Sequence, residues 1–75
     1  MKQKIISILT EIIPDVDFST ENNMVDDGIL DSFDLVSLIA ELNEAFDVEI
    51  AASDIDADNF NSVEAIEEMI NRLKQ

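Results

Sequence analysis

The sequence has 75 residues, of which 47% are apolar, and its 18 acidic and 4 basic residues give a formal net charge of −14 at pH 7. This length and apolar content predict one small domain over residues 1–75 rather than a disordered chain. All four basic residues lie near the chain ends, and the excess of carboxylates excludes nucleic acid and anionic membrane surfaces, which are bound through Lys and Arg.

The N-terminal segment lacks the features of a secretory signal, because it has neither a continuous apolar region nor a small-residue cleavage site. No uninterrupted apolar stretch is long enough to cross a bilayer, so no stable membrane insertion is expected. The chain has no cysteine and therefore no disulfide framework. These features predict a cytoplasmic protein, which we expect to be a monomer.

The first predicted helix runs from Lys2 to Ile13, where Pro14 ends it. The 17 residues from Pro14 to Leu30 then exceed the usual connection in a compact helical domain, so we expect apolar side chains to pin this loop. The candidate anchors are Phe18, Met24, Val25, Ile29 and Leu30. Gly28, the only glycine, is expected to supply a backbone turn that other residues resist.

The second predicted helix runs from Ser32 to Phe46, with Asp31 or Ser32 placed to accept hydrogen bonds from its first free amides. Its inward face is apolar at Leu35, Leu38, Ile39, Leu42 and Phe46. The opposite side mixes apolar, small and acidic residues, namely Phe33, Val36, Ser37, Ala40 and Glu44, flanked by Asp34 and Glu41. Exposed apolar groups rimmed by charge are typical of an interaction site, although Phe33 could instead fold back onto the long loop.

The remainder of the chain predicts a short extended piece at Val48–Ile50 and a short third helix formed by a turn at Ser53–Asp56. Ser62 then caps a final helix with one apolar face, formed by Val63, Ile66, Met69, Ile70 and Leu73. We therefore predict an all-α fold, a small four-helix bundle with three main helices, a short third helix and a long first loop.

The acidic segment that starts at Asp54 is similar to the opening of an EF-hand calcium loop. Counted from Asp54, the sixth position is Asn59 where glycine is required, and the twelfth is Ala65 where a bidentate Glu is required. No dedicated metal site is therefore predicted.

Ser32 is the residue with the most informative surroundings. The chain contains no histidine and no cysteine, so no imidazole can activate this hydroxyl as a catalytic nucleophile, and no catalytic residue is predicted. A serine at a helix start is then either a helix cap or a site at which another enzyme attaches a group.

The segment from Asp27 to Ile50, with its Asp31-Ser32-Phe33 triplet, resembles the acyl and peptidyl carrier protein family. In that family a serine that follows Asp and precedes an apolar residue receives 4'-phosphopantetheine from coenzyme A. The resemblance covers nearly the whole chain, including the four-helix plan, the long first loop and the acidic second helix. It implies a carrier that is not itself an enzyme, with the cofactor on Ser32.

The family resemblance also implies three kinds of partner enzyme: a phosphopantetheinyl transferase, an acyl- or aminoacyl-loading ligase or adenylating enzyme, and a downstream acyltransferase or synthase. The acidic residues beside Ser32 would meet basic residues of these enzymes. The predicted docking residues are Asp31, Phe33, Asp34, Val36, Ala40, Glu41 and Glu44. A thioester carrier without cysteine must acquire its thiol on such an arm, so the absence of cysteine fits this interpretation.

Three positions depart from familiar fatty-acid carriers, which usually have Leu, an acid and Pro where this chain has Phe33, Ser37 and Ala51. The Gly-Ile-Leu-Asp-Ser-Phe segment is similar to D-alanyl carrier proteins and to carriers of small biosynthetic clusters. A D-alanyl or other aminoacyl cargo is therefore the alternative to an acyl cargo. A rival of another class is an acidic helical module that binds a basic partner without any prosthetic group.

Overall fold

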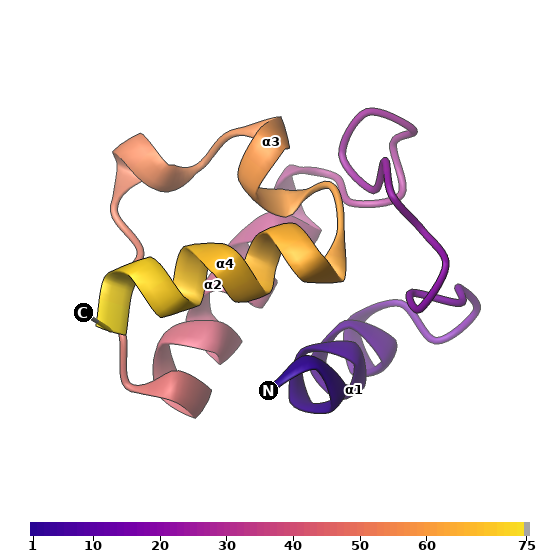
Figure 1. Ribbon diagram of the computed structural model, residues 1–75. Helices are drawn as coiled ribbons and strands as arrows, with labels where there is room; N and C mark the ends of the chain where they lie inside the picture. Colours follow the sequence, from indigo (N-terminus) through magenta and orange to yellow (C-terminus); the bar gives the residue numbers. More distant parts are fainter. Residues whose placement is uncertain (75) are drawn as a thin grey trace.

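The computed structural model describes residues 1–74, and within this range every regular element is a helix. The elements are α1 (Lys2–Ile12), α2 (Ser32–Phe46), the 3₁₀ turn η1 (Ala52–Asp54), α3 (Ala57–Phe60) and α4 (Val63–Lys74). Residues 13–31 form the long connection between α1 and α2 (Figure 1). The predicted all-helical fold, with three main helices, a short third helix and a long first loop, is confirmed.

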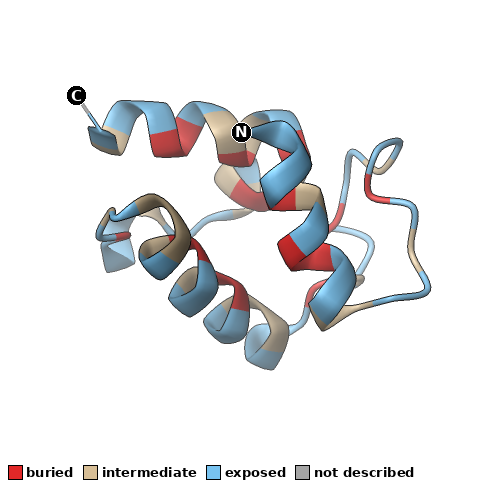
Figure 2. Ribbon diagram, turned by 90° about the horizontal axis from the view of Figure 1, so that it is seen from below, coloured by how far each residue is buried: buried red, intermediate tan, exposed pale blue. Residues whose placement is uncertain are grey.

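The core lies where α1 packs against α2 and α4, and α3 packs against α4. Buried positions face this common interior on every helix, whereas the outer sides of the helices are exposed (Figure 2). The buried helical side chains are Ile5, Ile8, Leu9, Leu38, Leu42, Phe60, Val63, Ile66, Met69 and Ile70. No helix within residues 1–74 is both long enough and apolar enough to cross a membrane.

The long loop is pinned to this core by its own apolar side chains, as predicted. Phe18, Met24 and Leu30 are buried, while Val25 and Ile29 are partly buried and pack against the same cluster. Gly28 adopts a positive φ of 75°. A Cβ placed there would meet no atom within 4 Å, so the glycine is required by the backbone conformation and not by lack of space.

The third helix differs in detail from the prediction. Ser53 lies inside η1, and the Asp54 carboxylate closes that turn by accepting from the Ala51 amide at 3.2 Å. Asp56 is the residue that caps α3, accepting from the Asn59 amide at 2.9 Å. Two acidic side chains, Asp54 closing η1 and Asp56 capping α3, therefore stabilise two short turns where the sequence pattern predicted one. The predicted Ser62 cap of α4 is confirmed, since its hydroxyl accepts from the Ala65 amide at 3.0 Å.

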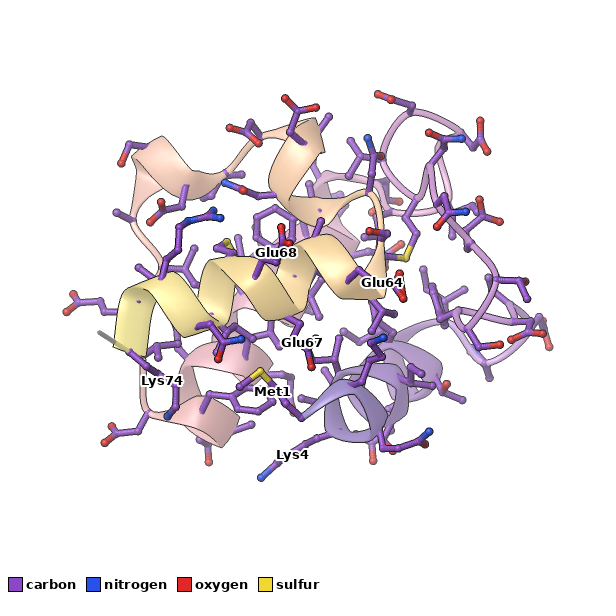
Figure 3. The ribbon with its side chains drawn as sticks, in the orientation of Figure 1. Met1, Lys4, Glu64, Glu67, Glu68 and Lys74 are labelled. Atoms are coloured by element: carbon purple, nitrogen blue, oxygen red, sulfur yellow. The ribbon has the colours of Figure 1, made fainter. Side chains whose placement is uncertain are left out.

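All four basic residues make contacts within the chain. Lys74 donates from Nζ to the Phe46 carbonyl oxygen at 3.0 Å, and the Lys4 ammonium lies 5.6 Å from the centre of the Phe46 ring. The side chains of Lys4 and Lys74 come from the two terminal helices and lie at the same end of the molecule (Figure 3).

Lys2 forms an ion pair with Glu64 at 3.5 Å, and Arg72 donates to the Asn59 side-chain oxygen at 2.9 Å. The Lys2–Glu64 contact is the sole ion pair within residues 1–74, so most carboxylates have no cation beside them. The last turn of α2 contains no basic residue of its own, and Lys74 supplies a favourable charge at its C-terminal end.

Self-repulsion among the carboxylates predicts that salt stabilises the fold. Raising the ionic strength from about 0.01 M to about 0.15 M shortens the Debye length from about 30 Å to about 8 Å. The melting temperature measured by circular dichroism should therefore rise. Replacing both Glu67 and Glu68 by Gln removes two charges and should reduce the size of this rise. A melting temperature that does not depend on salt would contradict the prediction.

Candidate functional site

The site is built at the start of α2, where Asp31 is the residue that caps the helix. Asp31 has an extended backbone, and its Oδ1 atom accepts from the Asp34 amide at 2.8 Å. Its carbonyl oxygen accepts from the Leu35 amide at 2.9 Å, which makes Ser32 the first residue inside the helix. The choice that the sequence left open between Asp31 and Ser32 as cap is thereby decided in favour of Asp31.

Ser32 is exposed, and its hydroxyl makes no hydrogen bond to any other part of residues 1–74. Because the Asp31 side chain satisfies the Asp34 amide, the Ser32 hydroxyl is not used for capping. The capping explanation for this serine is therefore removed. What is left is an accessible alcohol at the positive end of a 15-residue helix.

This position suits a phosphodiester in two respects. The amides of Ser32 and Phe33 belong to the first turn and have no acceptor four residues earlier in the helix. They are therefore available to donate to an anion. The helix dipole contributes roughly 0.3–1 kcal/mol in favour of a negative group at an exposed N-terminus. The carboxylates of Asp31 and Asp34 oppose this by repulsion. The residues present thus fit an attached phosphopantetheine, whose long arm would extend into solvent.

The outer face of α2 is exposed as the sequence predicted. Phe33 is 85% exposed and Val36 is 68% exposed, so Phe33 does not fold back onto the long loop. Asp34 is half-buried, and the other predicted docking residues on this side are exposed, namely Asp31, Ala40, Glu41 and Glu44. Together with exposed Ser37, these residues give the side of α2 that begins at Ser32 an apolar and acidic character. We call this set the α2 face.

The charge of the α2 face is not neutralised from within residues 1–74. The four basic side chains contact Glu64, the Phe46 ring, the Asn59 amide and the Phe46 carbonyl, all away from the start of α2. In the acidic segment 54–59, Asp54 and Asp56 accept hydrogen bonds from the Ala51 and Asn59 amides. No group of three metal-ligating side chains and no pocket is found within the described range.

A contact that the sequence did not predict joins the long loop to the end of α3. Asn61 makes side-chain and backbone hydrogen bonds to residues 24–26, which precede the site in the chain. Nothing in the local pattern around Asn61 signals this, since its partners lie 35 or more residues away.

Comparison with known proteins identifies the family. The family model described as "Phosphopantetheine attachment site" matches residues 3–70. This chain belongs to the phosphopantetheine attachment family. It is a carrier protein, non-catalytic, and its prosthetic group is 4'-phosphopantetheine.

Curated relatives support the same assignment. The D-alanyl carrier protein of Streptococcus sanguinis (strain SK36) is 32% identical over 75 residues, covering 99% of this carrier protein and 95% of the relative. The D-alanyl carrier protein of Bacillus cereus (strain B4264) is 39% identical over 62 residues, covering 79% and 77% respectively. These similarities establish a carrier protein without determining which group it carries.

The cap predicts a measurable difference between two substitutions of Asp31. Asp31→Ala removes the acceptor for the Asp34 amide and should lower the free energy of unfolding by about 1 kcal/mol. Asp31→Asn keeps an acceptor of equal capping strength, so its loss should be at most a few tenths of a kcal/mol. Urea denaturation of the two variants and the parent checks this. Equal losses in the two variants would show that the charge of Asp31 and not its cap stabilises α2.

Proposed function

We propose that Ser32 is the attachment residue, and that this stand-alone carrier holds acyl or aminoacyl groups as thioesters on its phosphopantetheine arm and delivers them to partner enzymes. The observation that supports this most directly is that Asp31 and Ser32 have different roles at the start of α2. Asp31 caps the helix, which leaves the adjacent Ser32 hydroxyl exposed and without a hydrogen-bonding role. We propose that the whole chain acts as a single carrier domain in the cytoplasm.

Attachment joins the Ser32 oxygen to the phosphorus that carries the pantetheine arm of coenzyme A. The bond to the nucleotide part of coenzyme A breaks, and that part leaves with its own phosphate. The hydroxyl proton must pass to a base of the transferase, because the chain has no histidine and Asp31 already directs its Oδ1 toward the Asp34 amide. The arm supplies the thiol that the sequence lacks, and a cargo is then held on it as a thioester.

The α2 face is proposed to dock the phosphopantetheinyl transferase, the loading ligase or adenylating enzyme, and the downstream acyltransferase or synthase. Its carboxylates have no cation beside them within residues 1–74, so they attract basic surfaces and raise encounter rates. Phe33 and Val36 expose apolar area close to Ser32, which a partner can bury on contact. Charge would thus guide the approach of a partner, and apolar contact would hold it.

The cargo has two candidates. An acyl group is one, and D-alanine or another amino acid of a small biosynthetic or cell-envelope pathway is the other. The second is favoured by the names of the relatives, which are D-alanyl carrier proteins in both Streptococcus and Bacillus. Intact-mass analysis of the protein from its native host distinguishes the two, because the attached thioesters differ in mass.

The rival hypothesis of an interaction module without a prosthetic group has less support. It explains the acidic and apolar α2 face but gives no reason for membership in a phosphopantetheine attachment family. It also leaves the exposed Ser32 without a role.

The assignment predicts the outcome of modification in vitro. Incubation with coenzyme A and a broad-specificity phosphopantetheinyl transferase should add one phosphopantetheinyl group, detected by intact mass, and Ser32→Ala should abolish the gain. Ser7→Ala is the control, since Ser7 is an exposed serine in α1 and is not part of the α2 face, and it should be modified like the parent. An unmodified parent chain with several transferases, or modification that persists in Ser32→Ala, would overturn the assignment.

The docking proposal predicts that the KM of the transferase depends more on where a charge lies than on the net charge of the protein. Glu41→Lys and Glu44→Lys should each raise the KM of the transferase for this protein by about tenfold at low salt. Glu68→Lys makes the same charge change at an exposed position of α4 and should raise KM much less. The differences should shrink as salt is added. Similar KM values for all three variants would show that α2 is not the docking helix.

A further inference from the structure

Asn61 lies between α3 and α4 and connects them to the long loop through four hydrogen bonds. Its Oδ1 atom accepts from the Val25 amide at 2.9 Å and the Asp26 amide at 3.2 Å. Its backbone oxygen accepts from the Met24 amide at 2.9 Å. The loop segment that makes these bonds, three of them as donor, passes beside the end of α3, far from it in the sequence (Figure 1).

The orientation of the Asn61 amide is fixed by its partners. The two backbone N–H groups can only donate, so the side-chain oxygen must face them. The Nδ2 group is thereby turned toward Asp26 and donates to its Oδ2 atom at 3.1 Å. The Asn61 side-chain amide thus anchors the backbone of the loop and orients the Asp26 carboxylate.

The loop segment that Asn61 anchors leads directly into the site. Met24, whose amide donates to Asn61, also accepts from the Leu30 amide at 2.9 Å, which closes residues 24–30 into one turn. Within this turn the Gly28 amide donates to the Val25 carbonyl at 3.1 Å. The next residue after Leu30 is Asp31, the cap of α2, and Ser32 follows. Asn61 therefore fixes the direction from which the chain enters the attachment site.

Asp26 is exposed and has no cation beside it within residues 1–74, because the four basic residues make their contacts elsewhere. Its carboxylate is held by a neutral amide, which fixes its direction and brings no positive charge beside it. A carboxylate that served solubility alone would not need to be held in one direction. A fixed and uncompensated charge on the turn that leads into Ser32 is suited to meeting a basic partner that approaches this serine.

We propose that Asn61 is a positioning residue that holds the 24–30 turn and directs the Asp26 carboxylate toward the basic partner that modifies Ser32, so that the docking surface includes this loop as well as the α2 face. This inference rests on the proposed function of Ser32. Because the carboxylate is already ordered, binding of the partner does not have to pay the entropy of ordering it. Affinity for the partner is therefore higher, while the rate of the transfer step is unchanged.

The test is the steady-state kinetics of phosphopantetheinylation, with the unmodified protein as the varied substrate and coenzyme A at saturation. Asn61→Ala should raise KM by about tenfold, as expected when a contact to a charged group is lost, and leave kcat within about twofold. The matched control is Asn59→Ala. Asn59 is in α3, and within residues 1–74 its side chain hydrogen-bonds to Asp54 and Arg72 and to no residue of the long loop. This control should leave KM within about twofold of the parent.

A second variant distinguishes the effect of a misdirected Asp26 carboxylate on KM from the effect of a loop that is no longer anchored. Asn61→Asp keeps an oxygen for the Val25 and Asp26 amides but loses the donor to the Asp26 carboxylate. It also adds a negative charge, which alone would lower KM for a basic partner. An increase in KM in this variant would therefore report the lost direction of Asp26. Asp26→Asn should raise KM similarly, and combining it with Asn61→Asp should add little, because both act on the same contact.

The outcomes separate this inference from the proposed function. A parent chain that gains no phosphopantetheine on Ser32 would overturn both. A parent that is modified normally, with unchanged KM in Asn61→Asp and Asp26→Asn, would overturn only the role of Asn61. An equal rise in Asn61→Ala and Asn59→Ala, with parent-like KM in Asn61→Asp, would show general destabilisation and also overturn it.

Discussion

The site depends on the burial of apolar side chains from the long first loop. Residues 13–31 have no regular secondary structure, and in so short a chain the core must hold them in place. Phe18, Met24 and Leu30 insert into the core that the helices form, and Leu30 is buried immediately before the exposed pair Asp31 and Ser32. A buried residue so close to Ser32, the proposed attachment residue, sets where α2 begins and which side of it faces outward.

The distribution of charge follows from the same arrangement. The four basic residues lie in the two terminal helices, and three of them contact Phe46 or Asn59, while Lys2 pairs with Glu64. Each positive charge is thus used to hold helices together. The start of α2 and the loop before it are left with carboxylates as their only charged groups, so all the charge around Ser32 is negative. Folding therefore separates the stabilising charges from those available to a partner.

The site combines two opposing electrostatic features, a helix N-terminus that favours an anion and two carboxylates that repel it. A phosphodiester attached to Ser32 would gain from the helix dipole, yet Asp31 and Asp34 would lie beside it and repel it. Asp31 is retained as a cap, because its Oδ1 atom satisfies the Asp34 amide. In the proposed docking, the same two carboxylates would also present charge to a basic enzyme. The modest electrostatic cost to the phosphate would then be offset by a stable helix start and by attraction of the partner.

The sequence by itself determined the three main helices, the long loop and the acidic and apolar outer side of α2. These follow from periodicity within each segment, which needs no information about distant residues. It also singled out Ser32, since a chain without histidine or cysteine leaves that hydroxyl no catalytic role. The family match over residues 3–70 then confirmed the carrier assignment that the resemblance implied.

Only the tertiary structure decided between Asp31 and Ser32 as cap, because a cap depends on backbone angles and not on residue type alone. It also decided that Phe33 points outward and that Asp56 caps α3 where the sequence placed a turn beginning at Ser53. The contact of Asn61 with residues 24–26 was not predictable, since it joins segments far apart in the chain. Local patterns specify helices, whereas such contacts exist only once the helices have packed.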